Sequence, residues 1–359
     1  MNKDCLSRIV LERLQSMDVT PTALPLGAAK DEKHVKILTT PNLASATRLL
    51  LIFPDSEFSG LGVLSFRHMV NVSLRFGSME TLVAAAQSSG YDGIVITNPA
   101  CIYWDETTHS AITHSSARAR DLANTKTTGS ILVSDAYLVP GHESPEKHIA
   151  SVLSYLSTLL HPKAKVDFIA CGYSAYGALA EFYRRYDGFW ENHLHTGVLT
   201  ESSHAVADLP HPLLREFLRR RCRNYIVHAD PAGTYLPPNL ITGVATYSSE
   251  VTDHGSGIVP TLIAEIMEYF KEGWEKEEIN PDIPILLNAE ELGNGESAWM
   301  EALKKMNLGG EVAGWDFEGK EEVEELRRKA DEEKVVIENW ENMAKEVGDG
   351  ARIEIIEEA

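Results

Sequence analysis

The stretch that most constrains the fold is residues 165–185, in which an apolar run, a turn and a helical pattern follow one another. The apolar run is rich in β-preferring residues, and the turn places Gly172 and Gly177 on either side of Ser174. A strand, a tight turn with a serine and a helix together describe the nucleophile elbow of α/β-hydrolases. The usual pattern is G-x-S-x-G, and here Tyr176 occupies the position of the last glycine. The spacing alone therefore leaves open a plain βα turn in which Ser174 caps the helix.

Apolar runs typical of buried strands alternate with helical patterns on both sides of this stretch. The candidate strands are 34–38, 48–53, 93–97, 131–134, 166–170, 194–199, 224–228 and 241–246, and the candidate helices are 78–89, 144–160, 178–185, 212–221 and 258–272. Strands that alternate with helices imply a mostly parallel sheet with helices on both faces. The predicted fold class is α/β, of the α/β-hydrolase type.

The pattern changes near both ends of the chain, which predicts three parts. Residues 1–33 form an amphipathic helix at 6–17 followed by a Pro/Gly/Ala-rich connection, residues 34–275 form the α/β-hydrolase-like domain, and residues 276–359 form an acidic extension, either α/β or helical. Within the main domain, residues 100–128 show no clear periodicity and are rich in Thr, Ser and His. We interpret them as a long surface excursion that could cover a site.

The charge is concentrated at the C-terminal end. Of the net charge of −20, residues 271–359 account for −15, with 26 acidic and 11 basic side chains. This balance argues against a broad basic surface, so we expect no direct binding of nucleic acid. A solvated acidic face is the ordinary interpretation of the extension.

The cysteines and the apolar runs bear on the compartment. The four cysteines are far apart and show no C-x-x-C or zinc spacing; they are Cys5, Cys101, Cys171 and Cys222. They indicate free thiols in a reducing compartment. No apolar run approaches the length of about 18 residues that a membrane span needs. The sequence therefore predicts a soluble intracellular protein without a membrane partner.

Three residues at the ends of separate candidate strands could form a catalytic triad. Ser174, Asp230 and His254 occur in the chain order Ser, acid, His of α/β-hydrolases. In that arrangement the serine attacks, the histidine is the general base and the carboxylate orients it. Glu201, after the preceding strand, is an alternative acid, and His204 is a rival base. Each also has an ordinary interpretation: a capping serine, an Asp-Pro turn and a loop histidine.

An oxyanion hole would need two backbone N–H groups near the serine hydroxyl. One would come from Ala175, and the other from the loop after residue 53, around Asp55 and Ser56. A carboxylate at Asp55 would oppose a developing oxyanion unless it points away. Together with Tyr176 in the turn, this carboxylate is the main argument against catalysis.

Motifs for cofactors and metals are not found in the sequence. It contains neither G-x-x-x-x-G-K-[ST] nor G-x-G-x-x-G. His193 and His195 could offer two metal ligands from one strand face, but no third ligand is evident. We therefore expect no cofactor and no metal.

Five stretches together resemble one family. They are the segment at 66–79, in which an aromatic and arginine-containing start leads to Asn-x-Ser-Leu-x-x-Gly-Ser-Met, the strand ending in Asn-Pro at 90–99, the helix start at 145–148, the elbow at 169–177 and the Thr-Glu-Ser-Ser-His segment at 200–204. Their order and spacing resemble the Argonaute-binding protein 2 family. That domain is also found fused behind class II histone deacetylases in fungi, and its animal relatives form the "family with sequence similarity 172" group.

The resemblance implies an α/β-hydrolase-like fold and an association with small-RNA silencing and heterochromatin, in the nucleus, the cytoplasm or both. It favours a protein-interaction subunit whose partners are Argonaute or chromatin-silencing proteins. The alternative is an active serine hydrolase of the esterase type that uses Ser174, His254 and Asp230. The sequence departs from the family pattern at Tyr173, Tyr176 and Glu201.

Overall fold

The computed structural model describes residues 3–56, 60–124, 137–206, 209, 211–237, 242–281 and 283. These residues lie in one compact unit, Met1–Ala298, and the second unit, Trp299–Ala359, falls outside them. Within the described ranges, no helix combines the length and the apolar character needed to cross a bilayer.

The described residues build one sheet of eight strands with the order β1-β2-β4-β3-β7-β8-β9-β10. The strands are β1 (Thr20–Leu24), β2 (Val35–Thr39), β3 (Arg48–Phe53), β4 (Gly93–Ile96), β7 (Lys165–Cys171), β8 (Leu194–Thr200), β9 (Cys222–Ile226) and β10 (Ala245–Ser248). Strand β2 runs antiparallel to both of its neighbours, and the other pairs are parallel. The remaining two strands, β5 (Cys101–Asp105) and β6 (Ser110–Thr113), form a separate antiparallel hairpin. With that hairpin set aside, this is the strand order of the α/β-hydrolase fold.

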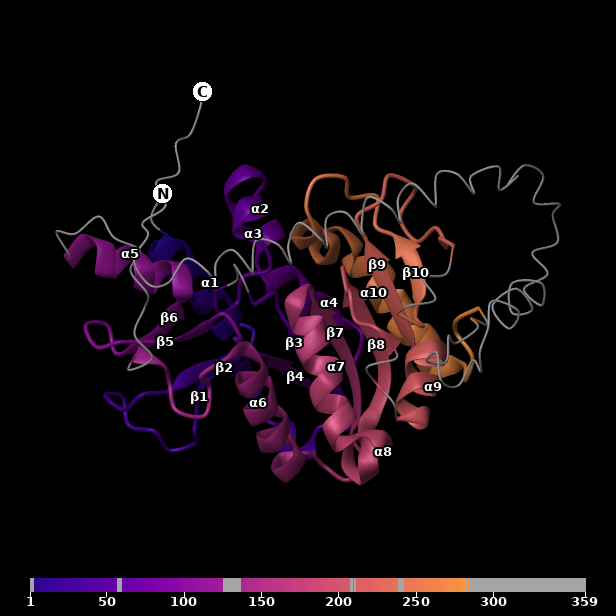
Figure 1. The fold of residues 1–359 in the computed structure, drawn as a ribbon, viewed down its shortest axis with the longest axis horizontal. Coiled ribbons are helices and arrows are strands. Elements are labelled where there is room, and N and C mark those ends of the chain that lie inside the picture. Colours follow the sequence, from indigo (N-terminus) through magenta and orange to yellow (C-terminus); the bar gives the residue numbers. More distant parts are fainter. Residues whose placement is uncertain are drawn as a thin grey trace, which may run out of the picture. The chain divides into compact units, whose positions relative to one another are not determined.

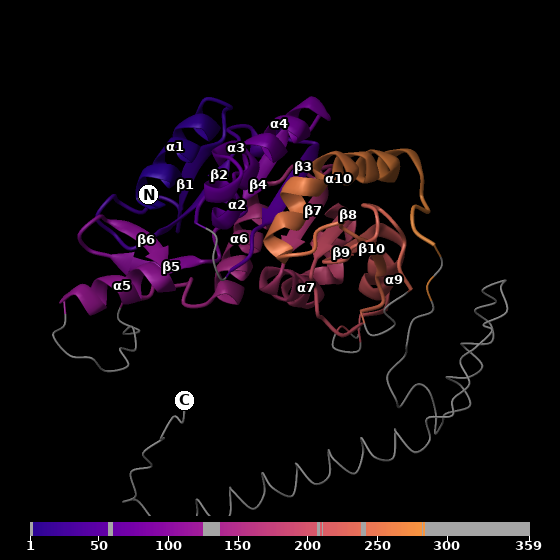
Figure 2. The same ribbon diagram turned by 90° about the horizontal axis from the view of Figure 1, so that it is seen from above.

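Helices cover both faces of the sheet (Figure 1). They are α1 (Lys3–Gln15), α2 (Phe66–Asn71), α3 (Leu74–Gly77), α4 (Glu80–Ser88), α5 (His114–Asn124), α6 (Pro145–Leu159), α7 (Tyr173–Arg185), α8 (Glu191–His193), α9 (Pro212–Arg221) and α10 (Ile258–Glu275). Figure 2 shows α1, α4 and α10 on one side of the sheet and α6, α7 and α9 on the other. The sheet is therefore the middle layer of three.

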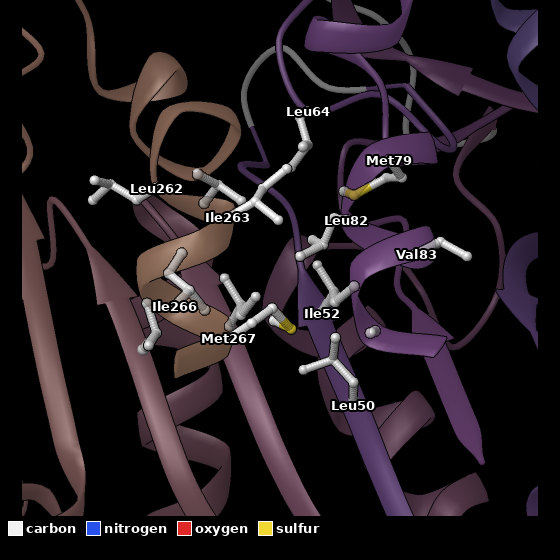
Figure 3. Packing of buried hydrophobic residues seen from close by; sticks show 14 of the residues in the cluster. Leu50, Ile52, Leu64, Met79, Leu82, Val83, Leu262, Ile263, Ile266 and Met267 are labelled. Carbon is white, nitrogen blue, oxygen red and sulfur yellow. The ribbon is translucent and has the colours of Figure 1, made fainter. Parts of the chain in front are cut away.

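The central strand β3 shows why the sheet is buried on both faces. Its residues are all apolar apart from Arg48, and successive side chains point to opposite faces. Leu50 and Ile52 pack under α4 and α10, while Leu49 and Leu51 belong to the core beneath α6, α7 and α9. Figure 3 shows Leu50 and Ile52 among side chains from α4 and α10, which pack next to each other. The two cores fix the strand ends from which the site is built.

Much of the predicted pattern is confirmed. The α/β class and the hydrolase-like sheet are as expected, β3 has the predicted bounds, and α6 begins after Ser144, whose hydroxyl accepts a hydrogen bond from the Lys147 N–H. The amphipathic N-terminal helix is α1, whose Leu6, Val10 and Leu14 are buried. Apolar residues that repeat every three or four positions were the signal for α1, and a capping serine followed by a proline was the signal for α6.

Two predictions about the N-terminal half were wrong. The Pro/Gly/Ala-rich connection begins inside strand β1, which pairs with β2 over its whole length despite Pro21. Proline is tolerated there because β1 is an edge strand. The excursion at 100–128 contains β5, β6 and α5 rather than irregular chain. The candidate strand at 131–134 and the acidic extension beyond residue 283 lie outside the described residues, and the proposed boundaries at 33 and 275 stay predictions.

Candidate active site

The turn that carries Ser174 has the backbone of a tight strand-to-helix turn. Strand β7 ends at Cys171 and helix α7 begins at Tyr173, so Gly172 alone connects them, with φ 52° and ψ −128°. A Cβ on Gly172 would lie 2.5 Å from Asp55 Oδ2, so glycine is required by both the positive φ and the space. Ser174 lies in the first turn of α7 with 1% of its surface exposed. Among the described residues, its hydroxyl has no hydrogen-bond partner.

A pocket of about 310 Å³ opens beside this turn. It is lined by Asp55, Leu64, Cys171, Gly172, Tyr173, Thr200, Glu201, Ser203, His254, Gly255, Ser256 and Val259. Most of these residues follow the carboxyl ends of β3, β7, β8 and β10, which is where ligands bind in open α/β sheets. The pocket is thus in the position where the sequence predicted a site, but Ser174 lies beneath its surface rather than in its lining.

Glu201 and His254 both line this pocket. Glu201 has φ 50°, uncommon for a residue with a side chain, and its carboxylate accepts a hydrogen bond from the Val227 N–H. Its Cγ is 2.7 Å from the position that a Cβ on Gly255 would take, so it lies against the turn that follows His254. His254 is exposed, and its Nδ1 accepts a hydrogen bond of 3.1 Å from the Ser256 N–H. Glu201, the alternative acid, therefore lies in the same pocket as His254, the candidate base.

Asp230 lies elsewhere. It is half exposed, and its carboxylate is 3.6 Å from His228 Nδ1. The hydroxyl of Ser248 donates to the Asp230 carbonyl oxygen at 2.6 Å, which ties this loop to the end of β10. Asp230 is not among the residues that line the pocket. The rival base, His204, is buried, with its Nδ1 2.7 Å from Ser202 Oγ.

The residues proposed for an oxyanion hole lie around the turn, but not in the arrangement that the sequence suggested. The Ala175 N–H donates to the Gly172 carbonyl oxygen at 3.1 Å. The Asp55 carboxylate lies against Gly172, inside the pocket, and Ser56 is partly buried beside it in the chain. A carboxylate in this position disfavours a second negative charge nearby.

Cys171 is a second potential nucleophile in the pocket. Burial raises the pKa of its thiol to about 12; the hydrogen bond with Thr200 acts in the opposite direction, and the charge of Asp55 adds to the rise. Because the thiolate is the reactive form, this raised pKa disfavours reaction of the Cys171 thiol at neutral pH.

The two histidines considered as metal ligands have other partners. His193 Nδ1 donates to the Phe189 carbonyl oxygen at 2.6 Å, and His195 Nδ1 is 2.7 Å from the buried carboxylate of Asp167. In the part of the chain that the structure describes, no group of three His, Cys, Asp or Glu side chains could hold a metal ion.

Besides Cys171, four polar residues of the pocket were not predicted as site residues from the sequence: Tyr173, Thr200, Ser203 and Ser256. Each lies within two positions of a residue that had been singled out at a strand end. Proximity to those strand ends was therefore the signal that could have identified them.

Comparisons with known proteins found one family model and several solved structures. A family model described as the Arb2 domain matches residues 1–232. No curated protein matches the chain. Among solved structures, a histone deacetylase from Saccharomyces cerevisiae has a TM-score of 0.44 and 14% identity, over 76% of this chain and 99% of that chain. The histone deacetylase Clr3 has a TM-score of 0.45 and 13% identity, over 75% of this chain and 38% of that chain.

A carboxyl esterase 2 from the mycorrhizal fungus Tuber melanosporum is also similar, with a TM-score of 0.36 and 10% identity over 71% of this chain and 85% of that chain. The family match extends from α1 to the loop after β9 and so includes the elbow, most of the sheet and Glu201. The chain therefore belongs to the Arb2 domain family.

Proposed function

We propose that this protein is an interaction subunit of a small-RNA silencing or heterochromatin complex, associated with Argonaute or with a histone deacetylase. It would work in the nucleus, the cytoplasm or both. Membership of the Arb2 domain family supports this proposal, as does the state of the hydrolase turn.

The observation that carries the proposal is the position of Ser174. A catalytic serine needs a base within hydrogen-bond reach and an approach for the substrate. Ser174 is buried, its hydroxyl has no partner among the described residues, and it is absent from the pocket lining. The carboxylate of Asp55 lies against Gly172 and lines the pocket, and its charge would oppose an oxyanion formed nearby. The turn thus retains its backbone without the arrangement that activates a serine.

A surface suited to a protein partner lies next to the pocket. Tyr173 and Tyr176, one turn apart on α7, are 67% and 48% exposed. Tyrosine is enriched at protein interfaces because its ring buries a large apolar area while its hydroxyl keeps a polar partner. We assign these two side chains to the partner contact.

Affinity purification of the tagged full-length chain from its native cells tests the proposal. We expect Argonaute or chromatin-silencing subunits to be recovered with the wild type and to be depleted with Tyr173→Ser/Tyr176→Ser. The matched control is Tyr235→Ser, which removes a 40% exposed tyrosine from the loop after β9. Recovery of metabolic enzymes alone would remove the silencing partnership.

A serine hydrolase is the second candidate, favoured by the joint presence of Glu201 and His254 in the pocket. In this alternative Ser174 attacks an acyl group, His254 takes its proton, and Glu201 or Asp230 orients the imidazole. Catalytic hydrogen bonds often tighten only once substrate is bound. A fluorophosphonate probe should then label the wild type and not Ser174→Ala, and a folded wild type that stays unlabelled contradicts the hydrolase.

A further inference from the structure

A second serine reaches the pocket at the end of a chain of hydrogen bonds. Ser256 lines the pocket, and its Oγ is 2.9 Å from Ser65 Oγ. Ser65 Oγ is in turn 2.8 Å from His68 Nδ1. Ser65 is 3% exposed, so this chain is shielded from water at its centre. It connects a hydroxyl in the pocket to an imidazole on α2.

The backbone around these three residues holds the chain in place. Ser65 caps α2, and its hydroxyl also accepts from the His68 N–H. The His68 ring lies against Gly257, where an added Cβ would be 2.9 Å from its Cε1. On the other side, the Ser256 N–H donates to His254 Nδ1. The loop before α2 and the turn before α10 are thus fastened to each other at this point.

The bonding pattern allows a proton to move from the pocket to the imidazole. A hydroxyl donates one hydrogen bond and accepts others, and an imidazole nitrogen without a proton accepts. Ser256 can therefore donate to Ser65, and Ser65 to His68 Nδ1. Ser174 has no partner among the described residues, whereas Ser256, which lines the pocket together with Ser203, has a partner that leads to a base.

We propose that Ser256 is a nucleophile of this pocket and that Ser65 and His68 relay its proton. The reaction is transfer of an acyl group from an ester. Ser256 Oγ forms a bond to the carbonyl carbon, its proton passes to Ser65 while the Ser65 proton passes to His68, and the ester C–O bond breaks. The departing alkoxide takes the proton back through the relay, and water hydrolyses the acyl-serine by the same route.

The charges of the pocket define the class of ester. Asp55 and Glu201 contribute two carboxylates, and no lysine or arginine is among the described residues that line it. An anionic substrate would be repelled by both, so the ester is neutral or carries a positive charge. A volume of about 310 Å³ is at the lower end of the range of ligand pockets, which suits a short acyl chain. This proposal rests on the hydrolase alternative but replaces its nucleophile.

Labelling with a fluorophosphonate probe separates the two serines. We expect the wild type and Ser174→Ala to be labelled and Ser256→Ala to remain unlabelled, with the modified peptide containing Ser256. The matched control is Ser157→Ala, a serine of α6 away from the pocket. Labelling lost only in Ser174→Ala, or no labelling of the folded wild type, overturns the assignment of Ser256.

The relay has its own test, because Ser65 and His68 also have a capping role. His68→Asn keeps an acceptor near the Nδ1 position but cannot take up a proton. The thermal unfolding midpoint should therefore change little. Hydrolysis of p-nitrophenyl acetate should fall roughly 10²–10⁴-fold, which is the usual contribution of a general base. In His68→Ala, added millimolar imidazole should restore part of the rate. An unchanged rate in folded His68→Asn, or no rescue of folded His68→Ala, removes the relay.

These outcomes are independent of the silencing complex. If affinity purification recovers silencing subunits and Ser256 stays unlabelled, the interaction role stands and the acyl-transfer proposal falls. If Ser256 is labelled and no such subunit is recovered, the reverse holds.

Discussion

The buried pair of His142 and His148 should make stability depend strongly on pH. The Asn98 N–H donates to His148 Nε2 at 2.9 Å, so the proton of His148 must be on its Nδ1. That Nδ1 lies 2.9 Å from His142 Nδ1, which must accept. Protonating His142 at this nitrogen would set two N–H groups against each other inside the protein.

The magnitude follows from the shifted pKa values. Burial lowers the pKa of His142 from 6.5 to about 4, although the nearby Glu143 acts in the opposite direction. Burial, followed by the proximity of His142, lowers the pKa of His148 well below 6.5. A depressed histidine pKa gives stability that is complete above about pH 6.5 and is lost as the pH falls, because the unfolded state binds the proton first. For His142 alone the loss between pH 8 and pH 5 is about 2 kcal/mol, and it approaches about 3 kcal/mol below pH 4.

The variant His142→Asn isolates this effect, since its amide oxygen can accept from His148 Nδ1 but does not titrate. Urea unfolding followed by circular dichroism should be measured for both proteins at intervals from pH 8 to pH 5. We expect the wild type to lose about 2 kcal/mol more than the variant over this range, with equal m-values. Ser154→Asn on the exposed side of α6 controls for the substitution itself. Parallel stability curves for wild type and His142→Asn would refute the tautomer assignment and the buried neutral pair.

Three further predictions concern the turn, the core and the pocket. Gly172→Ala should lower the thermal stability of the protein by more than Gly141→Ala does. Both glycines have positive φ, but only Gly172 faces a neighbour, a carboxylate oxygen 2.5 Å from the new Cβ. Equal losses of stability would mean that the carboxylate moves freely. Asp167→Asn should cost roughly 1–3 kcal/mol in urea unfolding, because this buried side chain bonds a tyrosine, a histidine and a tryptophan, while the exposed Asp253→Asn should cost about 0–1 kcal/mol; similar losses contradict the buried network. Cys171 should resist iodoacetamide in the native state at pH 8 and react after unfolding, as read by peptide mass spectrometry; native alkylation would contradict its raised pKa.

The sheet and the strand ends could be predicted from the sequence because their signals are local. The apolar residues of β3, and Ser144 followed by Pro145 at the start of α6, each specify one element without reference to the rest of the chain. The serine turn was predicted in the same way, from a strand, a glycine and a helix. Strand β1 was missed because its pairing with β2 is a long-range contact, which outweighs the weak strand preference of Thr20–Leu24.

The choice between Asp230 and Glu201 could not be made from sequence. Both follow a strand of the parallel sheet and both lie between Ser174 and His254 in the chain, and strand order favoured Asp230. The Ser248 hydroxyl holds the Asp230 carbonyl, which fixes the loop after β9 beside the end of β10, while the positive φ of Glu201 turns its side chain toward Gly255. A loop conformation of this kind depends on contacts between distant residues, and no residue pattern in either loop encodes it.

Packing also explains why a hydrolase-type turn can form around Ser174, whose hydroxyl has no partner among the described residues. Ala175 and Ala178, beside Ser174 in α7, are buried in the core beneath the sheet, and Gly172 is held between β8 and the carboxylate of Asp55. Packing alone therefore requires small residues and a glycine at these positions, whether or not the hydroxyl reacts. The pocket is built by different residues, from loops whose side chains the core does not restrict. Backbone geometry at the elbow is thus an argument for the fold, and only groups that reach the pocket, such as Ser256 and His254, can argue for a reaction.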